Sequence, residues 1–269
     1  MRCDDKDEKC RTDFQSVHQN GRIGNPSYNR MKLLDLTLDT AAENIALDEA
    51  LLAAAEHSDS PREVLRLWES PDPMVVIGRS SQVDVEVDRE ICRRRGIPVF
   101  RRTTGGAAIV AGPGCYMYAV VLSYELHPHL QNISAAHCFV LNTLVRALTN
   151  LVPQAKIQGI SDLAVDGMKF SGNSMRCGRS HLLYHGTILY AFDISLVSSC
   201  LRSPPRQPDY RQGRNHREFV QNVTLDCDRL REAMVETWQA NDPLSDWPRG
   251  MIEPLVADKY SKNEWNLRR

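Results

Sequence analysis

Two arginines, two threonines and two glycines stand together at residues 101–106, directly before an apolar run. A Gly-Gly pair lets the backbone approach a ligand without interference from a Cβ atom, and its N–H groups can point at an anion. Arg101 and Arg102 would add fixed positive charge, and Thr103 and Thr104 would add hydroxyl donors. The segment matches neither common phosphate-loop pattern. It therefore suits either an anion site or a tight turn between strands with solvated arginines.

Two further segments carry residue types that can do chemistry. Lys169 follows the Asp166-Gly167 turn on an expected strand, where its ammonium could stabilise developing negative charge. His185-Gly186-Thr187 places a glycine inside another strand, a position that indicates close approach of a ligand or of another backbone. A strand lysine more often faces solvent, however, and a single histidine is more often structural. These residues alone leave both interpretations open.

Composition bounds the class of protein. The 269 residues are 42% hydrophobic and 25% charged, which is typical of a globular protein with a real core. A formal net charge of −1 argues against nucleic acid or an anionic membrane as the partner, because such proteins usually carry a basic excess. Apolar runs such as residues 116–122 are far shorter than the roughly 18–20 residues that cross a bilayer. We expect a cytoplasmic protein without a signal peptide.

The cysteines do not indicate a scaffold. Eight are scattered along the chain with no CxxC pair, so neither a zinc cage nor a small disulfide framework is predicted, and no metal ligands are assigned. One of them could still be a nucleophile.

Patterning predicts a single folded domain. Residues 1–30 are polar and aperiodic, so we expect a disordered tail. Folded sequence is expected to begin at Met31, which raises the hypothesis that translation also starts there. Residues 31–269 show no internal repeat and no Gly/Ser linker, and we expect them to form one catalytic domain without a C-terminal accessory domain.

Local signals predict the elements of that domain. Thr40 and Glu43 form a capping box before an apolar periodic run, and Asp166-Gly167 is a strong hairpin signal. Ser134 is the expected N-cap of a later helix. We predict helices at 41–56, 85–95, 133–152 and 224–240, a strand pair at 64–69 and 73–78, a hairpin at 162–170, and strands at 116–124 and 181–192. Helices and strands follow one another here without strict β-α-β alternation, which favours an α+β fold around a mixed, mostly antiparallel sheet flanked by helices.

Six segments, taken in order, resemble the lipoate-protein ligase A family, whose catalytic domain is shared with biotin ligases and octanoyltransferases. They are residues 40–52, 75–82, 101–110, 161–172, 185–189 and 259–266. The resemblance spans essentially residues 31–269 and implies a biotin/lipoate protein ligase-like fold.

The resemblance also implies roles for individual residues. Lys169 corresponds to the essential lysine of the family. The residues expected to line the acyl-adenylate and substrate pocket are Arg101, Arg102, Thr104, Gly105, Gly106, Ala107, Asp162, Gly172, His185, Gly186 and Thr187. Ala107 replaces a third glycine of the family pattern, and residues 111–115 depart from it. The basic residues 211–217 resemble the family's adenylate-covering loop, although they also suit a solvated loop.

By this resemblance the chain would be a ligase that uses ATP with Mg²⁺ to activate lipoate or octanoate. The acceptors would be lipoyl-domain proteins, namely 2-oxoacid dehydrogenase E2 subunits and the glycine-cleavage H protein, and a separate accessory protein could be needed. The alternative is an octanoyltransferase that moves octanoyl from acyl carrier protein through a cysteine thioester. Cys200 is the candidate nucleophile, although its flanking residues do not match. A non-catalytic paralogue that binds lipoyl carriers is the third hypothesis.

Overall fold

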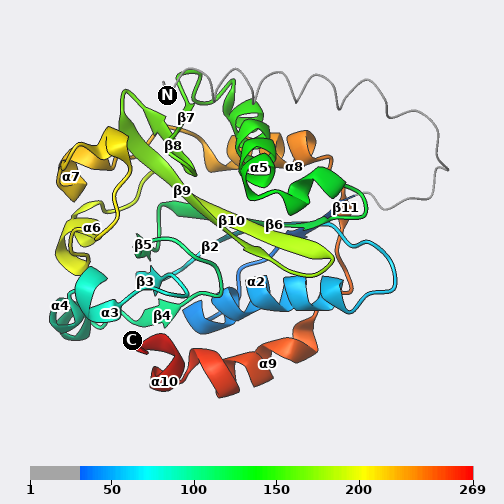
Figure 1. Ribbon diagram of the computed structural model, residues 1–269, viewed down its shortest axis with the longest axis horizontal. Helices are drawn as coiled ribbons and strands as arrows, with labels where there is room; N and C mark the ends of the chain where they lie inside the picture. Colours follow the sequence, from blue (N-terminus) through cyan, green and yellow to red (C-terminus); the bar gives the residue numbers. More distant parts are fainter. Residues whose placement is uncertain (1–30, 269) are drawn as a thin grey trace.

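The computed structural model describes residues 31–268, and the expectations for residues 1–30 fall outside this part of the chain. Two sheets and several helices make up the fold (Figure 1). The larger sheet has eight strands, in the order β11-β1-β2-β6-β10-β9-β8-β7, and the smaller has three, in the order β4-β3-β5. The predicted α+β class with a mixed, mostly antiparallel sheet is confirmed.

The strands of the larger sheet are β1 Lys32–Asp35, β2 Val64–Glu69, β6 Cys115–Ser123, β7 Lys156–Gln158, β8 Asp162–Val165, β9 Met168–Cys177, β10 His181–Leu189 and β11 Asp242–Pro243. Those of the smaller sheet are β3 Met74–Ile77, β4 Val99–Arg101 and β5 Ile109–Ala111. Strand β1 runs parallel to β2 and β11, and β3 runs parallel to β4. The other pairs of named strands are antiparallel.

The α-helices are α2 Ala41–Glu56, α3 Val83–Glu86, α4 Arg89–Arg95, α5 Ile133–Leu148, α6 Ser195–Cys200, α7 His216–Phe219, α8 Cys227–Trp238, α9 Ile252–Leu255 and α10 Asn263–Asn266. Short 3-10 turns form at Pro128–Gln131, Asp209–Arg211 and Arg249–Met251, and a π turn forms at Val256–Tyr260. No helix within residues 31–268 is both long and apolar enough to span a bilayer.

The larger sheet is buried on both faces. Along β6, Tyr116, Tyr118 and Val120 belong to a core cluster with α5 and α8, whereas Met117 and Ala119 belong to a cluster with α2 and the smaller sheet. Successive side chains of a strand point to opposite faces, so one strand supplies both cores. In Figure 1, α5 and α8 cover one face of the sheet and α2 and α9 lie on the other. The sheet is therefore the middle layer that carries the strands of the candidate site.

Local signals located two elements correctly. Helix α2 begins at Ala41 with the predicted capping box, in which Thr40 accepts from the backbone of Glu43 while the Glu43 carboxylate accepts from Thr40. Asp166 and Gly167 have φ of 50° and 74°, which Asp and Gly tolerate, and they join β8 to β9 as predicted. Both features depend only on residues close in sequence.

Three predictions were wrong. Strands β2 and β3 form but do not pair, because the Ser-Pro-Asp-Pro link lacks tight-hairpin residues and the chain passes to the other sheet. The helix expected at 85–95 is split into α3 and α4, since Val87 is extended and forms a β-bridge with Leu201. Asn132 and not Ser134 caps α5, its side chain accepting from Ala135 N–H.

Glu56, at the end of α2, holds the turn between β9 and β10. Its carboxylate accepts from the backbone N–H groups of Arg179, Ser180 and His181 at 2.9, 2.9 and 2.8 Å. Burial raises its pKa, but these hydrogen bonds outweigh burial and lower the pKa to about 2. A carboxyl whose folded pKa is depressed stabilises the protein above its unfolded pKa and loses that contribution as pH falls toward the folded value.

Glu56→Gln is therefore expected to lower the free energy of unfolding at pH 7 by about 1–2 kcal/mol, less than full linkage would give because the carboxylate keeps some contact with water. The difference from wild type should shrink as pH falls from about 4.5 toward about 2. Urea unfolding across this range measures it. A pH-independent difference would contradict the prediction.

Candidate functional site

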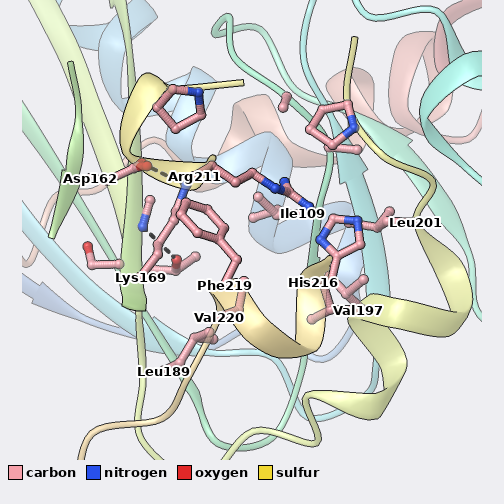
Figure 2. Close-up of a pocket in the computed structure, with 18 of the residues that line it drawn as sticks. Ile109, Asp162, Lys169, Leu189, Val197, Leu201, Arg211, His216, Phe219 and Val220 are labelled. Carbon is pink, nitrogen blue, oxygen red and sulfur yellow. Dashed lines mark hydrogen bonds and ion pairs between the residues drawn. The ribbon is translucent and has the colours of Figure 1, made fainter. Parts of the chain in front are cut away.

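The candidate site is a pocket between β9, β10, the segment after the Gly-Gly pair and a cover segment, by which we mean residues 202–219 (Figure 2). Of the predicted site residues, Ala107, Asp162, Lys169, Gly172 and Thr187 line it. Strand pairing brings these residues together, because Asp162 lies opposite Gly172 in the β8–β9 ladder. A register irregularity between Leu163 and Ala164 then shifts Lys169 opposite Ala164.

Lys169 is one of the cations that line the pocket. Its Nζ lies 2.6 Å from Asp162 Oδ1, and its side chain is 27% exposed. A Cβ at position 172 would lie 2.8 Å from Lys169 Nζ, so Gly172 is the residue type that leaves room for the ammonium. The ammonium is thus held by a carboxylate and remains reachable from the pocket.

Tyr210 closes this pair from the cover segment, a contact that the sequence did not indicate. Its hydroxyl donates to Asp162 Oδ2 at 2.8 Å. Burial, and then the charge of Asp162, raise the pKa of Tyr210, so the phenol stays protonated and acts as the donor. Arg214 holds the same segment to the β8–β9 turn by donating to Gly167 O at 2.9 Å. The cover segment is therefore latched to the hairpin that carries Lys169.

The pocket combines an apolar part with a cationic part. The apolar side chains come from β5, β10, α6 and α7 and include Ile109, Val110, Leu189, Val197, Leu201, Phe219 and Val220. The cationic side chains are Lys169, Arg202, Arg206 and Arg211, and the carboxylates are Asp162 and Glu86. Such a lining suits a ligand that is apolar at one end and anionic at the other.

Arg101 lies behind the pocket wall and does not line it. Its guanidinium donates to the backbone carbonyls of Gly78, Arg79, Ser81, Trp265 and Arg268. The side chain is almost fully buried, and burial lowers its pKa. Arg101 therefore ties the loop after β3 to the C-terminal helix α10, and its charge is used within the protein.

Arg102 has a comparable structural role in the Gly-Gly loop. Its guanidinium donates to Val76 O at 3.1 Å, to Ala107 O at 3.0 Å and to Gly105 O. Burial lowers the pKa of Arg102 to about 10, so it remains a cation near neutral pH. Gly106 has a φ of 86°, and a Cβ there would lie 2.9 Å from Arg102 Nη2. The arginine thus organises the loop, and the glycine makes room for it.

A buried hydrogen-bond chain links this loop to α2. Thr104 Oγ1 lies 2.7 Å from His185 Nε2, and His185 Nδ1 lies 2.9 Å from Asp48 Oδ2. Asp48 Oδ1 accepts from Arg66 Nη1 at 2.7 Å, and Arg66 Nη2 donates to Asn44 Oδ1 at 2.6 Å. Three elements, α2, β2 and β10, therefore converge on one threonine of the loop.

The proton positions in this chain follow from donor chemistry. Arg102 Nε donates to Thr104 Oγ1 at 3.0 Å, and a guanidinium has no acceptor. The His185 Nδ1–H donates to the Asp48 carboxylate, and the Thr104 hydroxyl is hydrogen-bonded to both Arg102 Nε and His185 Nε2. His185 is thereby fixed in orientation, and it contacts the loop where the sequence had placed it against a ligand.

Sequence reasoning missed Asp48, Arg66 and Asn44. Two signals were present: Asn44 and Asp48 are spaced i, i+4 on one helix face, and Arg66 interrupts the apolar strand β2. Gly186, which was predicted, makes room for Asn173, whose amide oxygen accepts from Tyr118 OH at 2.5 Å. Gly105, like Gly106, lies in the loop and is not part of the pocket lining.

Cys200 does not face the pocket. It is fully buried at the end of α6, in the core cluster shared with α2 and the smaller sheet. No cysteine is among the pocket-lining residues of the described chain. Likewise, no group of three or more His, Cys, Asp or Glu side chains within residues 31–268 is arranged to hold a metal ion.

Comparisons with known proteins agree with this geometry. The lipoyl protein ligase A/B catalytic domain model matches residues 40–238. A putative lipoate-protein ligase A of Aeropyrum pernix is 32% identical over 57% of this chain and 55% of that protein. Lipoate-protein ligase A subunit 1 of Thermoplasma acidophilum is 25% identical over 88% of this chain and 96% of that one. The octanoyltransferase LipM of Brevibacillus brevis is also 25% identical, over 85% of this chain and 95% of that protein.

Solved structures show the same fold. A bi-partite lipoate protein ligase of T. acidophilum aligns with a TM-score of 0.75 at 24% identity, covering 90% of this chain and 98% of that one. A lipoate-protein ligase A bound with ATP aligns with a TM-score of 0.73 at 23% identity, covering 88% of this chain and 98% of that one. The biotin/lipoate ligase-like fold expected from the motifs is confirmed. Since the family model covers most of the chain and the pocket lies within it, the chain belongs to the lipoyl protein ligase A/B catalytic domain family.

Proposed function

We propose that the chain is a lipoate-protein ligase, which activates lipoate or octanoate with ATP and transfers the acyl group to a lysine of a lipoyl-domain protein. The observation that carries this proposal is that Lys169, paired with Asp162, lines one pocket together with apolar and cationic side chains, and that no cysteine is among the described residues of this lining. An acyl chain suits the apolar part, and an adenylate phosphate suits the cationic part.

The chemistry needs a fixed cation in this pocket. In the first step a carboxylate oxygen attacks the α-phosphorus of ATP, and the bond to pyrophosphate breaks. In the second step the neutral amine of the acceptor lysine attacks the acyl carbonyl, the bond to AMP breaks, and the amine proton leaves to solvent. Negative charge develops on the phosphoryl oxygens and then on the carbonyl oxygen. The Lys169 ammonium, oriented by Asp162, can stabilise both. Mg²⁺ would enter with the ATP phosphates.

The relatives support this proposal in two ways. Structures of T. acidophilum lipoate protein ligase with bound lipoic acid and of lipoate-protein ligase A with bound ATP share the fold of this chain. In addition, the T. acidophilum relative is a subunit of a bi-partite ligase studied with its E2 lipoyl domain. We propose that this chain likewise acts on E2 lipoyl domains and the glycine-cleavage H protein in the cytoplasm, with a separate accessory protein.

The alternative is octanoyl transfer from acyl carrier protein, which the similarity to the B. brevis octanoyltransferase favours. That route needs a thiolate beside the acyl chain. Cys200 is fully buried and does not line the pocket, and burial raises the pKa of the Cys115 thiol to about 12. A non-catalytic carrier-binding role has less support, since Lys169 lies in the pocket and is paired with a carboxylate. The ligase reaction therefore fits this pocket better than either alternative.

The ligase is tested by incubating the full chain with ATP, Mg²⁺, octanoate or lipoate, and an apo lipoyl domain, with intact-mass detection of the acylated acceptor. Modification should require ATP, and Cys200→Ser should leave it unchanged. If acylation instead occurs only from octanoyl acyl carrier protein, without ATP, and is lost in Cys200→Ser, the transferase is correct. Should neither donor acylate the acceptor, with an accessory protein supplied, the chain is not a ligase.

A further inference from the structure

Four basic side chains gather beside the Gly-Gly loop, and we call them the basic rim: Arg79, Arg176, Lys259 and Arg268. Contacts connect them, although they come from three separate parts of the chain. Arg176 Nη1 and Lys259 Nζ lie 3.2 and 2.7 Å from the carboxylate oxygens of Glu49. Lys259 Nζ and the Arg268 guanidinium lie 4.1 and 4.0 Å from the centroid of the Trp265 ring. Arg268 Nη2 donates to Arg79 O at 3.1 Å, which completes the series.

The basic rim carries more positive charge than its neighbours compensate. Within residues 31–268, Glu49 is the only carboxylate that forms an ion pair with any of its four members. Burial lowers the pKa of Lys259, and Glu49 opposes this effect. The charges of Arg176 and Arg268 lower this pKa further, because the cations repel one another. The rim therefore has a local positive potential that attracts an anionic partner, although the whole chain is nearly neutral.

The fold orders the basic rim before any partner binds. Trp265, which contacts two of its members, belongs to α10 and donates its indole N–H to Arg101 O at 2.8 Å. This hydrogen bond holds α10 beside β4 (Figure 1). Tyr260 OH donates to Glu49 at 2.7 Å and so fixes the carboxylate that two of the cations share. Side chains that are already ordered lose less entropy on binding, which suits the rim to a partner.

The basic rim borders the candidate pocket. Arg79 N–H donates to Thr104 O at 2.8 Å, at the start of the Gly-Gly loop. Residues 105–107 are exposed, and Ala107 also lines the pocket, so the pocket reaches the surface beside this loop. On β9, Arg176 lies four residues after the pocket residue Gly172, or roughly 13 Å at the rise of a strand. A protein bound to the rim would therefore cover the Gly-Gly loop and meet the pocket opening.

The proposed reaction needs such a protein. In its second step the attacking amine belongs to a lysine of a folded domain, and a pocket of about 130 Å³ admits a side chain but not a domain. The body of the acceptor must therefore rest on the surface around the opening. The basic rim supplies uncompensated charge of one sign at that surface, and such charge selects a partner surface of the opposite sign.

We propose that the basic rim is the docking surface for the acceptor, and that it binds an acidic surface next to the target lysine. This inference rests on the proposed function, because it takes the acceptor to be a protein whose lysine is acylated. Arg79 and Arg268, the two exposed members of the rim, would contact the acidic side chains directly. Charges at the edge of an interface act mainly on the rate of encounter, so binding should weaken as the salt concentration rises.

The test measures binding of an apo E2 lipoyl domain to the full chain by isothermal titration calorimetry, without ATP and at several NaCl concentrations. Arg79→Glu reverses the charge at an exposed position of the rim and should weaken binding by about tenfold at low salt, and by less at high salt. Arg229→Glu makes the same change on α8, which covers the opposite face of the larger sheet, and should change affinity less than about twofold. Arg79→Ala should fall between Arg79→Glu and wild type, and circular dichroism checks that each variant folds.

An exchange of charges tests what the rim recognises. Acidic residues near the target lysine of the lipoyl domain are changed singly to lysine. These domains should bind the wild-type chain more weakly, and at least one should regain affinity for Arg79→Glu. If none regains affinity, the rim does not recognise acidic side chains and the inference fails.

Three other results would overturn the inference. The first is equal affinity of wild type and Arg79→Glu for the lipoyl domain, or no binding by wild type. The second is weakening by Arg217→Glu but not by Arg79→Glu, which would place the acceptor on the cover segment. The third is loss of binding to an accessory protein with unchanged binding to the lipoyl domain, which would assign the rim to that protein.

The acylation assay separates this inference from the proposed function. Arg79→Glu should raise the KM for the lipoyl domain and leave kcat unchanged, because the rim lies outside the pocket lining. An unchanged KM in a working ligase would refute the docking surface alone. If ATP-dependent acylation fails while Arg79-dependent binding persists, the docking surface stands and the ligase does not.

Discussion

Alanine at position 169 is expected to slow acylation of the lipoyl domain by about 100- to 1000-fold, the range typical for removing one preorganised donor at a transition state. Lys169 Nζ lies 2.6 Å from Asp162 in the pocket that we propose for the acyl-adenylate. The substitution removes the cation that stabilises both steps, whereas the apolar wall remains. The loss should therefore appear mainly in kcat, measured by intact mass at saturating octanoate and ATP.

Two further variants separate this role from a general loss of positive charge. Lys156→Ala removes an exposed lysine of β7 in the same sheet and should keep wild-type activity. Gly172→Ala places a Cβ 2.8 Å from Lys169 Nζ, so it displaces the ammonium without removing it and should also reduce kcat. Wild-type rates in Lys169→Ala would refute the proposed mechanism for either acyl donor.

Asp48→Ala is expected to lower the free energy of unfolding by about 3–5 kcal/mol, which is the usual cost of breaking a buried ion pair from one side. Arg66 has a fully buried side chain, and Asp48 lies 2.7 Å from it. The substitution leaves the guanidinium without its counter-charge and also removes the acceptor of His185 Nδ1–H. Urea unfolding at pH 7 measures the effect.

The hydrogen-bond chain offers matched controls for this prediction. Asp48→Asn keeps an acceptor of nearly the same shape, so it should cost less than Asp48→Ala. Thr104→Ser retains the hydroxyl that contacts His185, whereas Thr104→Val does not, and only the valine should increase hydrogen exchange in residues 104–107. If the free energy of unfolding of Asp48→Ala lies within about 1 kcal/mol of the wild-type value, the carboxylate does not hold this core together.

The sequence predicted those features that depend on neighbouring residues. The capping box at Thr40 and the turn at Asp166-Gly167 are satisfied within a few residues, and the structure contains both. Strand partners depend on segments far apart, and so β2 and β3 were paired wrongly although each strand was located. The break after α3 has the same origin, because Val87 is held extended by Leu201.

For the candidate site, too, the sequence predicted the residues within local motifs but not the contacts between distant segments. Family-like motifs identified Lys169, Asp162 and Gly172, which the β8–β9 pairing brings to one pocket. The motifs could not show that the guanidinium groups of Arg101 and Arg102 donate to backbone carbonyls. Two of the carbonyls that accept from Arg101 belong to residues more than 160 positions later in the chain. Nor could they show the basic rim, since its members come from segments far apart in the sequence.

The Arg101 contacts also bear on the order in which the protein matures during synthesis. Arg101 is made early, but the carbonyls of Trp265 and Arg268 that it needs are made more than 160 residues later. Until then a guanidinium destined for the interior lacks two of its acceptors. A nascent chain can fold its hairpins and α2 during translation, but the segment beside the glycine pair reaches its final state only after Trp265 and Arg268 have been made. Products that stop before Trp265 should therefore lack a competent pocket even when most of the sheet has formed.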